Sequence, residues 1–179
     1  MRVRRISAAL AAAALLAGGV ALVPTAAYAS LSSITCVGTS EVAYSPPITP
    51  ALQLVTATVD ADYSACVAVL SGAITSATST SVTSTSQRSC ANILGVFTAA
   101  FSIPWNTGQV SAGPATVTTT QLASALQVVS AGTFASGPFT GNTFVYTVTY
   151  ANVDAVTECQ NGGLSSLDNG RVLLQVTPL

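Results

Sequence analysis

The run from Asn142 to Tyr150, Asn-Thr-Phe-Val-Tyr-Thr-Val-Thr-Tyr, constrains the fold of this chain more than any other segment. Phe144, Tyr146, Val148 and Tyr150 recur at every second position, and valine and threonine fill the positions between them. β-Branched and aromatic residues that alternate in this way fit a pleated, half-buried surface. The run therefore predicts a central strand around which the other strands assemble.

The first 29 residues are typical of a secretory signal peptide. Three arginines within the first five residues precede an apolar stretch over Ser7–Val23, and Ala27-Tyr28-Ala29 supplies the small residues of a cleavage site. The apolar stretch is shorter than the about 20 residues that a bilayer span needs. We expect cleavage between Ala29 and Ser30, which leaves residues 30–179 as a single secreted domain with no membrane attachment.

Charged residues are scarce in the predicted mature chain. It has no lysine and no histidine, and Arg88 and Arg171 face six carboxylates, a net charge of −4. No basic patch can be built from two arginines, which argues against nucleic acid or an anionic membrane surface as a partner. Threonine, serine, alanine, valine and glycine dominate the chain, and this composition favours strands over helices.

The four cysteines all follow the predicted cleavage site. An even number of cysteines in an exported protein indicates two disulfides. Of the three pairings that four cysteines allow, we favour Cys36–Cys66 with Cys90–Cys159, because sequential strands are often neighbours. The intervals between these cysteines contain no Cys-x-x-Cys and the chain has no histidine, so neither a metal site nor a cofactor is expected.

Short strands separated by turn signals run along the mature chain, with turns expected at Asp60-Ala61-Asp62 and Asp168-Asn169-Gly170 and a loop over Asp154–Leu167. The Ser/Thr run Ile74–Ser86 is either an edge strand, which we favour, or a loop. This pattern predicts an all-β fold, an antiparallel β-sandwich of the immunoglobulin-like or a related Greek-key type. The expected strands are Leu31–Tyr44, interrupted at Gly38, then Leu52–Val59, Cys66–Leu70, Val96–Ile103, Ala115–Thr120, Leu126–Ser130, Asn142–Tyr150 and Arg171–Thr177.

No catalytic motif stands out in this sequence. A Ser-His-Asp triad is impossible without histidine, and neither Gly-x-Ser-x-Gly nor Ser-x-x-Lys occurs. The clustered carboxylates are Asp60, Asp62, Asp154 and Glu158, which would suit a calcium site or a glycosidase acid pair. We favour solvated turn residues, because the chain has no Asp-x-Asp-x-Asp-Gly loop. We therefore expect no enzymatic activity.

Aromatic and hydroxyl side chains supply the remaining candidates. Trp105 lies in the turn Pro104–Gly108 and either stacks on a ligand or, as we favour, caps one end of the core. Tyr44 and Tyr63 are further candidate ligand contacts. Threonines within the Ser/Thr run suggest a hydroxyl-bearing face, O-glycosylation, or simply a solvated edge strand that resists aggregation, which we favour. These threonines are Thr75, Thr78, Thr80, Thr83 and Thr85.

Several short motifs are similar to those of a recurring type of exported protein. They are Cys36-Val37-Gly38, Ala43-Tyr44-Ser45-Pro46, Ser89-Cys90, Ile103-Pro104-Trp105 and Gly137-Pro138-Phe139-Thr140-Gly141. Together they resemble short exported actinobacterial proteins with two cysteine pairs and no assigned activity. The resemblance implies an extracellular β fold and brings no catalytic residues.

The function expected from the sequence is a secreted, non-enzymatic protein with a structural or binding role at the cell envelope. Its partner would be a cell-wall glycan or an extracellular protein. The alternatives are a carrier of a small molecule, a protease inhibitor that presents the segment Gln160–Asn169, and a carboxylate-dependent hydrolase. A weaker alternative is an ice-binding or surface-binding threonine array. A cleft that gathers Trp105, Tyr44 or Tyr63 would favour binding over a structural role.

Overall fold

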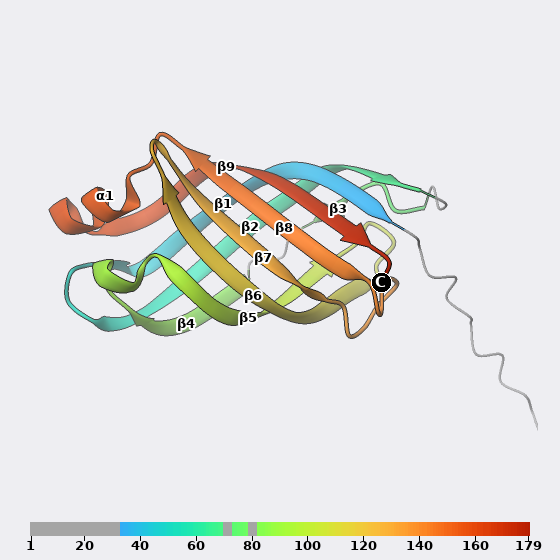
Figure 1. Ribbon diagram of the computed structural model, residues 1–179, viewed down its shortest axis with the longest axis horizontal. Coiled ribbons are helices and arrows are strands. Elements are labelled where there is room, and N and C mark those ends of the chain that lie inside the picture. The colour runs from blue at the N-terminus through green and yellow to red at the C-terminus, as the bar shows by residue number, and fades with distance from the viewer. Residues whose placement is uncertain (1–32, 70–72, 79–81) are drawn as a thin grey trace, which may run out of the picture.

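The computed structural model describes residues 33–69, 73–78 and 82–179, and most of these residues lie in strands (Figure 1). One 3₁₀-helix, η1 (Cys90–Asn92), and one α-helix, α1 (Ala155–Gly162), lie between strands. The strands are β1 (Ile34–Ile48), β2 (Gln53–Ala68), β3 (Ala77–Thr78), β4 (Val82–Arg88), β5 (Gly95–Pro104), β6 (Val110–Leu122), β7 (Ala125–Thr133), β8 (Thr143–Ala151) and β9 (Leu164–Thr177).

All nine strands that the described residues form belong to one antiparallel sheet. Its order is β3-β2-β1-β9-β8-β7-β6-β5, and β4 pairs with β2 beside β3. The prediction of an antiparallel all-β fold is confirmed, but the strands form one curled sheet instead of the two packed sheets of a sandwich (Figure 1). Several of these strands are 13 to 16 residues long. Twist accumulates along and across strands of this length, so the sheet can cover its own concave face.

The predicted central strand is confirmed as β8, which lies between β7 and β9 in the interior of the sheet. Phe144, Tyr146, Val148 and Tyr150 are all buried on the concave face, whereas Val145 between them is 40% exposed on the convex face. The alternation in the sequence therefore predicts correctly which side chains of β8 face the interior: the aromatic residues lie inside and the small β-branched residues lie outside.

The turn expected at Asp60-Ala61-Asp62 is wrong, because β2 runs without a break from Gln53 to Ala68. β1 pairs with β2 along nearly its whole length, and a shift of register lies beside Gly38. A Cβ atom on Gly38 would overlap the carbonyl oxygen of Asp62, so glycine is needed for the close approach of the two strands. The interruption expected at Gly38 is thus a β-bulge inside a continuous strand.

Two further segments that lie outside the expected strands are also bulges or bends in continuous strands. β1 passes through Ser45-Pro46-Pro47 and ends at Ile48, which pairs with Leu164 of β9. β9 passes through Asp168-Asn169-Gly170, where Ser40 pairs with Gly170 and Val42 with Leu167. The shift leaves extra residues on β9, with Asn169 at a φ of 56°. Turn-forming residues mark a bulge here because the flanking residues remain paired.

The loop expected over Asp154–Leu167 is wrong, since the segment forms α1 and the start of β9. Asp154 caps the helix: its carboxylate accepts hydrogen bonds from Thr157 N at 3.0 Å and Thr157 Oγ1 at 2.8 Å. These bonds hold the pKa of the Asp154 carboxyl below its usual value. Within the Ser/Thr run, Ala77–Thr78 form β3 and Val82–Ser86 belong to β4, in agreement with the preferred edge strand, whereas Ile74–Ser76 lie outside the strands and 79–81 lie outside the described residues.

The two disulfides join Cys36 to Cys66 and Cys90 to Cys159, which are the pairings that we preferred from the sequence. The first links directly opposed residues of β1 and β2. The second links η1 to α1 and so holds the helix against the connection between β4 and β5. The predicted signal peptide lies outside the described residues. No helix in the described part of the chain combines the length and the apolar character of a membrane span.

Candidate functional site

The concave face of the sheet is filled with aromatic side chains at the end near the C-terminus. Phe144 stacks on Phe101 and Phe134, with ring centroids 4.6 Å and 4.5 Å apart. Phe139 lies between Phe134 and Trp105 in the same cluster. The edges of the sheet also meet at this end, because Ala77 of β3 forms a bridge to Trp105 directly after β5. This half of the interior is a packed core.

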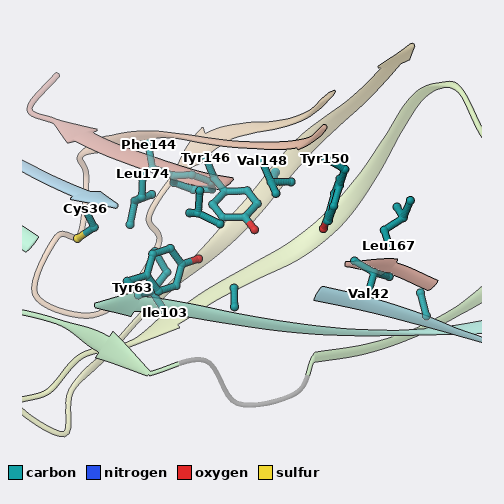
Figure 2. Close-up of a cluster of buried hydrophobic side chains, with 14 of the residues drawn as sticks. Cys36, Val42, Tyr63, Ile103, Phe144, Tyr146, Val148, Tyr150, Leu167 and Leu174 are labelled. Atoms are coloured by element: carbon teal, nitrogen blue, oxygen red, sulfur yellow. The ribbon is translucent and has the colours of Figure 1, made fainter. Parts of the chain in front are cut away.

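The other half of the concave face, toward α1, encloses a cavity of about 210 Å³. Its wall is mostly aliphatic and aromatic, and every strand except β3 contributes to it. Figure 2 shows Val148 and Tyr150 of β8 in line with Tyr146, with Val42 and Leu167 beyond them. Tyr63 lies across the interior from Tyr146, with their ring centroids 6.2 Å apart (Figure 2).

Small residues at inward positions explain why this half is not filled. On β2, Ala57 and Ala61 alternate with Val55, Val59 and Tyr63, all facing the interior. Ala115 of β6 and Ser130 of β7 are buried at corresponding inward positions of the opposite wall. Leucine or phenylalanine at such positions would fill a core to the density usual in proteins. The alanines instead leave a space that is large enough to hold a ligand.

Four tyrosines line the cavity, and we refer to Tyr44, Tyr63, Tyr146 and Tyr150 as the cavity tyrosines. Burial raises the pKa of every one of these phenols, that of Tyr44 to about 12 although the positive charge of Arg88 opposes the shift. All four are therefore neutral at physiological pH. The Tyr150 hydroxyl lies 3.3 Å from the Ser40 hydroxyl, so these two groups share a hydrogen bond inside the apolar wall.

The cavity reaches the surface between β4 and β5, which we call the mouth. These strands are consecutive in the chain, yet no backbone ladder joins them in the described residues. Ser84 of β4 and Phe97, Ala100 and Ser102 of β5 line the cavity and are also exposed to solvent. Arg88, which is partly buried, lies over the Phe97 ring with its Cζ atom 4.7 Å from the ring centroid. The mouth is therefore edged by one aromatic ring, one guanidinium and small side chains.

The structure brings two of the three sequence-predicted ligand contacts to the cavity, Tyr44 and Tyr63. Trp105 does not line it. The indole is 2% exposed, Nε1 donates to Ser111 Oγ at 2.9 Å, and the ring packs edge-on against Phe139. An indole whose polar group is satisfied inside the core caps the packed end, as we favoured, and is not available for stacking on a ligand at the surface.

The clustered carboxylates do not form a common site with the cavity. Asp60 and Asp62 lie exposed on the convex face of β2, whereas Asp154 caps α1 and Glu158 lies within that helix. Within the described residues, no three carboxylate or cysteine side chains gather closely enough to hold a metal ion. Of the threonines in the Ser/Thr run, Thr85 shares a hydrogen bond with Thr56 on the convex face at 2.9 Å. Thr80 lies outside the described residues.

The sequence reasoning missed most of the cavity wall, and Arg88 above all. The signal was present in the alternation of alanine with larger apolar residues along β2, and in an arginine within an otherwise uncharged segment. Chemically, the wall offers apolar contact, phenol and hydroxyl groups, and a single guanidinium. Comparison with protein-family models, with curated proteins and with solved structures gives no match to this chain.

Proposed function

We propose that this protein is an exported, non-catalytic binding protein that holds a small apolar molecule inside its curled sheet. The observation that carries the proposal is the cavity of about 210 Å³, with its apolar wall and its mouth between β4 and β5. Ligand sites in proteins are typically concave and mostly apolar, with a few polar groups that orient the ligand. The two disulfides support an oxidising, extracellular setting for this role.

The volume of the cavity limits the size of the ligand. An engineered apolar cavity of about 150 Å³ binds benzene, so in proportion a cavity of this size accommodates about eight non-hydrogen atoms. A longer molecule would extend through the mouth into solvent. The ligand class that fits is therefore a small aromatic compound or a short alkyl chain.

A carrier role accounts for the cavity better than the other roles expected from the sequence. A purely structural protein gains stability from a filled core, because each buried methylene contributes about 0.8 kcal/mol. The segment Gln160–Asn169, considered as an inhibitory loop, belongs to α1 and to the paired strand β9 and is therefore not an extended loop. Among the described residues, the cavity wall contains no carboxylate of the kind that a hydrolase with two acid groups requires.

Isothermal titration calorimetry of the exported protein with indole and with 1-octanol tests the proposal. We expect one site per chain for each compound and a negative heat-capacity change, the robust marker of buried apolar surface. Replacing Ala57 by leucine places three more carbon atoms in the cavity and should weaken or abolish both interactions. The matched control is Ala43→Leu, at an exposed position of β1. No binding to the unmodified protein, or equal binding by both variants, would refute the proposal.

A further inference from the structure

Arg88 is the only charged residue in the described part of the cavity wall. Its position on β4 opposite Gln53 of β2 turns it inward, along with Ser84 and Ser86. Nε donates a hydrogen bond to Ser86 Oγ at 2.9 Å, and the guanidinium lies against the face of Phe97. These two contacts fix the plane of the guanidinium at the mouth of the cavity.

The contacts of Arg88 leave most of its hydrogen-bonding capacity unused within the described residues. A guanidinium presents five N–H donors in a rigid fork, and stacking on a ring leaves the in-plane donors free. Here only Nε has a hydrogen-bond acceptor among the described residues. The guanidinium is partly buried, and its positive charge opposes the rise in the pKa of Tyr44 in the cavity wall. A partly buried guanidinium with free donors favours an anionic partner.

We propose, building on the function proposed above, that the natural ligand is a small amphipathic monocarboxylate. Its apolar body lies in the cavity, and its carboxylate is held at the mouth by the two Nη groups of Arg88. The fork of a guanidinium matches the two oxygens of a carboxylate, which gives the ligand a fixed orientation. The size limit of the cavity makes an acid with a chain of about eight carbons a suitable probe.

The test compares octanoate with 1-octanol, which have the same chain length and differ in the charge of the head group. Calorimetric titrations of the exported protein at neutral pH should show octanoate binding about tenfold more tightly than octanol, as expected for charge-assisted hydrogen bonds. Arg88→Gln should remove this preference, so that octanoate and octanol bind to the variant with similar affinities. Arg88→Lys, which keeps the charge without the fork, should retain part of it. Arg171→Gln removes the other arginine of the mature chain, an exposed residue of β9, and is the matched control.

The outcomes separate this inference from the function on which it rests. If indole and octanol bind but octanoate is no tighter than octanol, the assignment of Arg88 is overturned and the apolar binding function stands. The same conclusion follows if Arg88→Gln and Arg171→Gln reduce octanoate binding equally, because the effect is then one of net charge. If none of the three compounds binds, the proposed function fails and this inference fails with it. Circular dichroism spectra of each variant verify that it is folded.

Discussion

Two leucines of β9 give a matched measure of how the interior is filled. Leu174 is fully buried in the packed half, where it pairs with Cys36 of β1 and Tyr146 of β8. Leu167 is 3% exposed and lines the cavity. The two residues are of the same type, on the same strand and equally hidden from solvent, so truncating each to alanine removes the same atoms from different surroundings.

The expected losses of stability differ because only one truncation opens a new space. Leu→Ala substitutions in a well-packed core cost about 2.7 to 5.0 kcal/mol, and the cost rises with the volume of the cavity that is left. Leu174→Ala should therefore lie near the upper limit, at about 4 to 5 kcal/mol. Leu167→Ala enlarges a cavity that already exists and loses fewer contacts, so it should lie near about 2.5 to 3 kcal/mol.

Urea denaturation with both disulfides intact, followed by far-ultraviolet circular dichroism and by the fluorescence of Trp105, measures these free energies of unfolding. Trp105 is the only tryptophan of the chain and lies in the packed half, so its emission reports directly on that region. Unchanged dependence on urea would show that the variants unfold from the same native state. Equal losses, or a larger loss for Leu167→Ala, would refute the claim that the half near α1 contains a cavity.

Three further predictions concern the frame around the cavity. Gly38→Ala forces a Cβ atom into the Asp62 carbonyl and should destabilise the protein by more than about 2 kcal/mol in urea denaturation. The control Gly162→Ala adds a Cβ atom that meets no atom within 4 Å and should change stability by less than about 0.5 kcal/mol. Similar losses for the two variants would contradict the bulge geometry. Replacing Cys90 and Cys159 together by alanine removes a disulfide that spans 69 residues and should lower the free energy of unfolding by up to about 4.4 kcal/mol in urea denaturation. A loss below about 1 kcal/mol would contradict a stabilising role for this disulfide. The cavity tyrosines have a pKa above the ordinary 10.0, so their contribution to stability should be constant well below pH 10.0 and should fall as pH rises past it, by up to about 1.4 kcal/mol per pH unit for each tyrosine. Ultraviolet absorbance that shows these tyrosines ionising near pH 10.0 in the folded protein would be inconsistent with this prediction.

The alternation of residues predicts strands here more reliably than it predicts where strands end. Phe144, Tyr146, Val148 and Tyr150 identify β8 and its inward face correctly, because period-two burial is a local property. Asp60-Ala61-Asp62 and Asp168-Asn169-Gly170 carry equally strong turn signals and lie within long strands. β2 and β9 both pair with β1 along these segments, and this pairing outweighs the local preference for a turn. Asp168-Asn169-Gly170 therefore forms a bulge, and Asp60 and Asp62 lie on the exposed convex face.

The cavity depends on distant parts of the chain and could not be read from any single segment. Ala57 on β2 and Ala115 on β6 are separated by more than fifty residues, and their small size matters only because both line the same space. Arg88 matters for the same reason, because it lies over Phe97 and no backbone ladder joins β4 to β5 within the described residues. A single curled sheet brings these residues together, and the sequence pattern of short strands is equally compatible with a sandwich.

Crystals of the protein pressurised with xenon would test the central claim most directly, because xenon enters apolar cavities without requiring a particular ligand. The account predicts xenon on the concave face in the half near α1, in contact with Ala57, Val128 and Val148 of the cavity wall. Xenon should be absent from the packed half around Phe144. Diffraction that places no xenon on the concave face, or finds the side chains of the cavity wall packed against one another, would contradict the account.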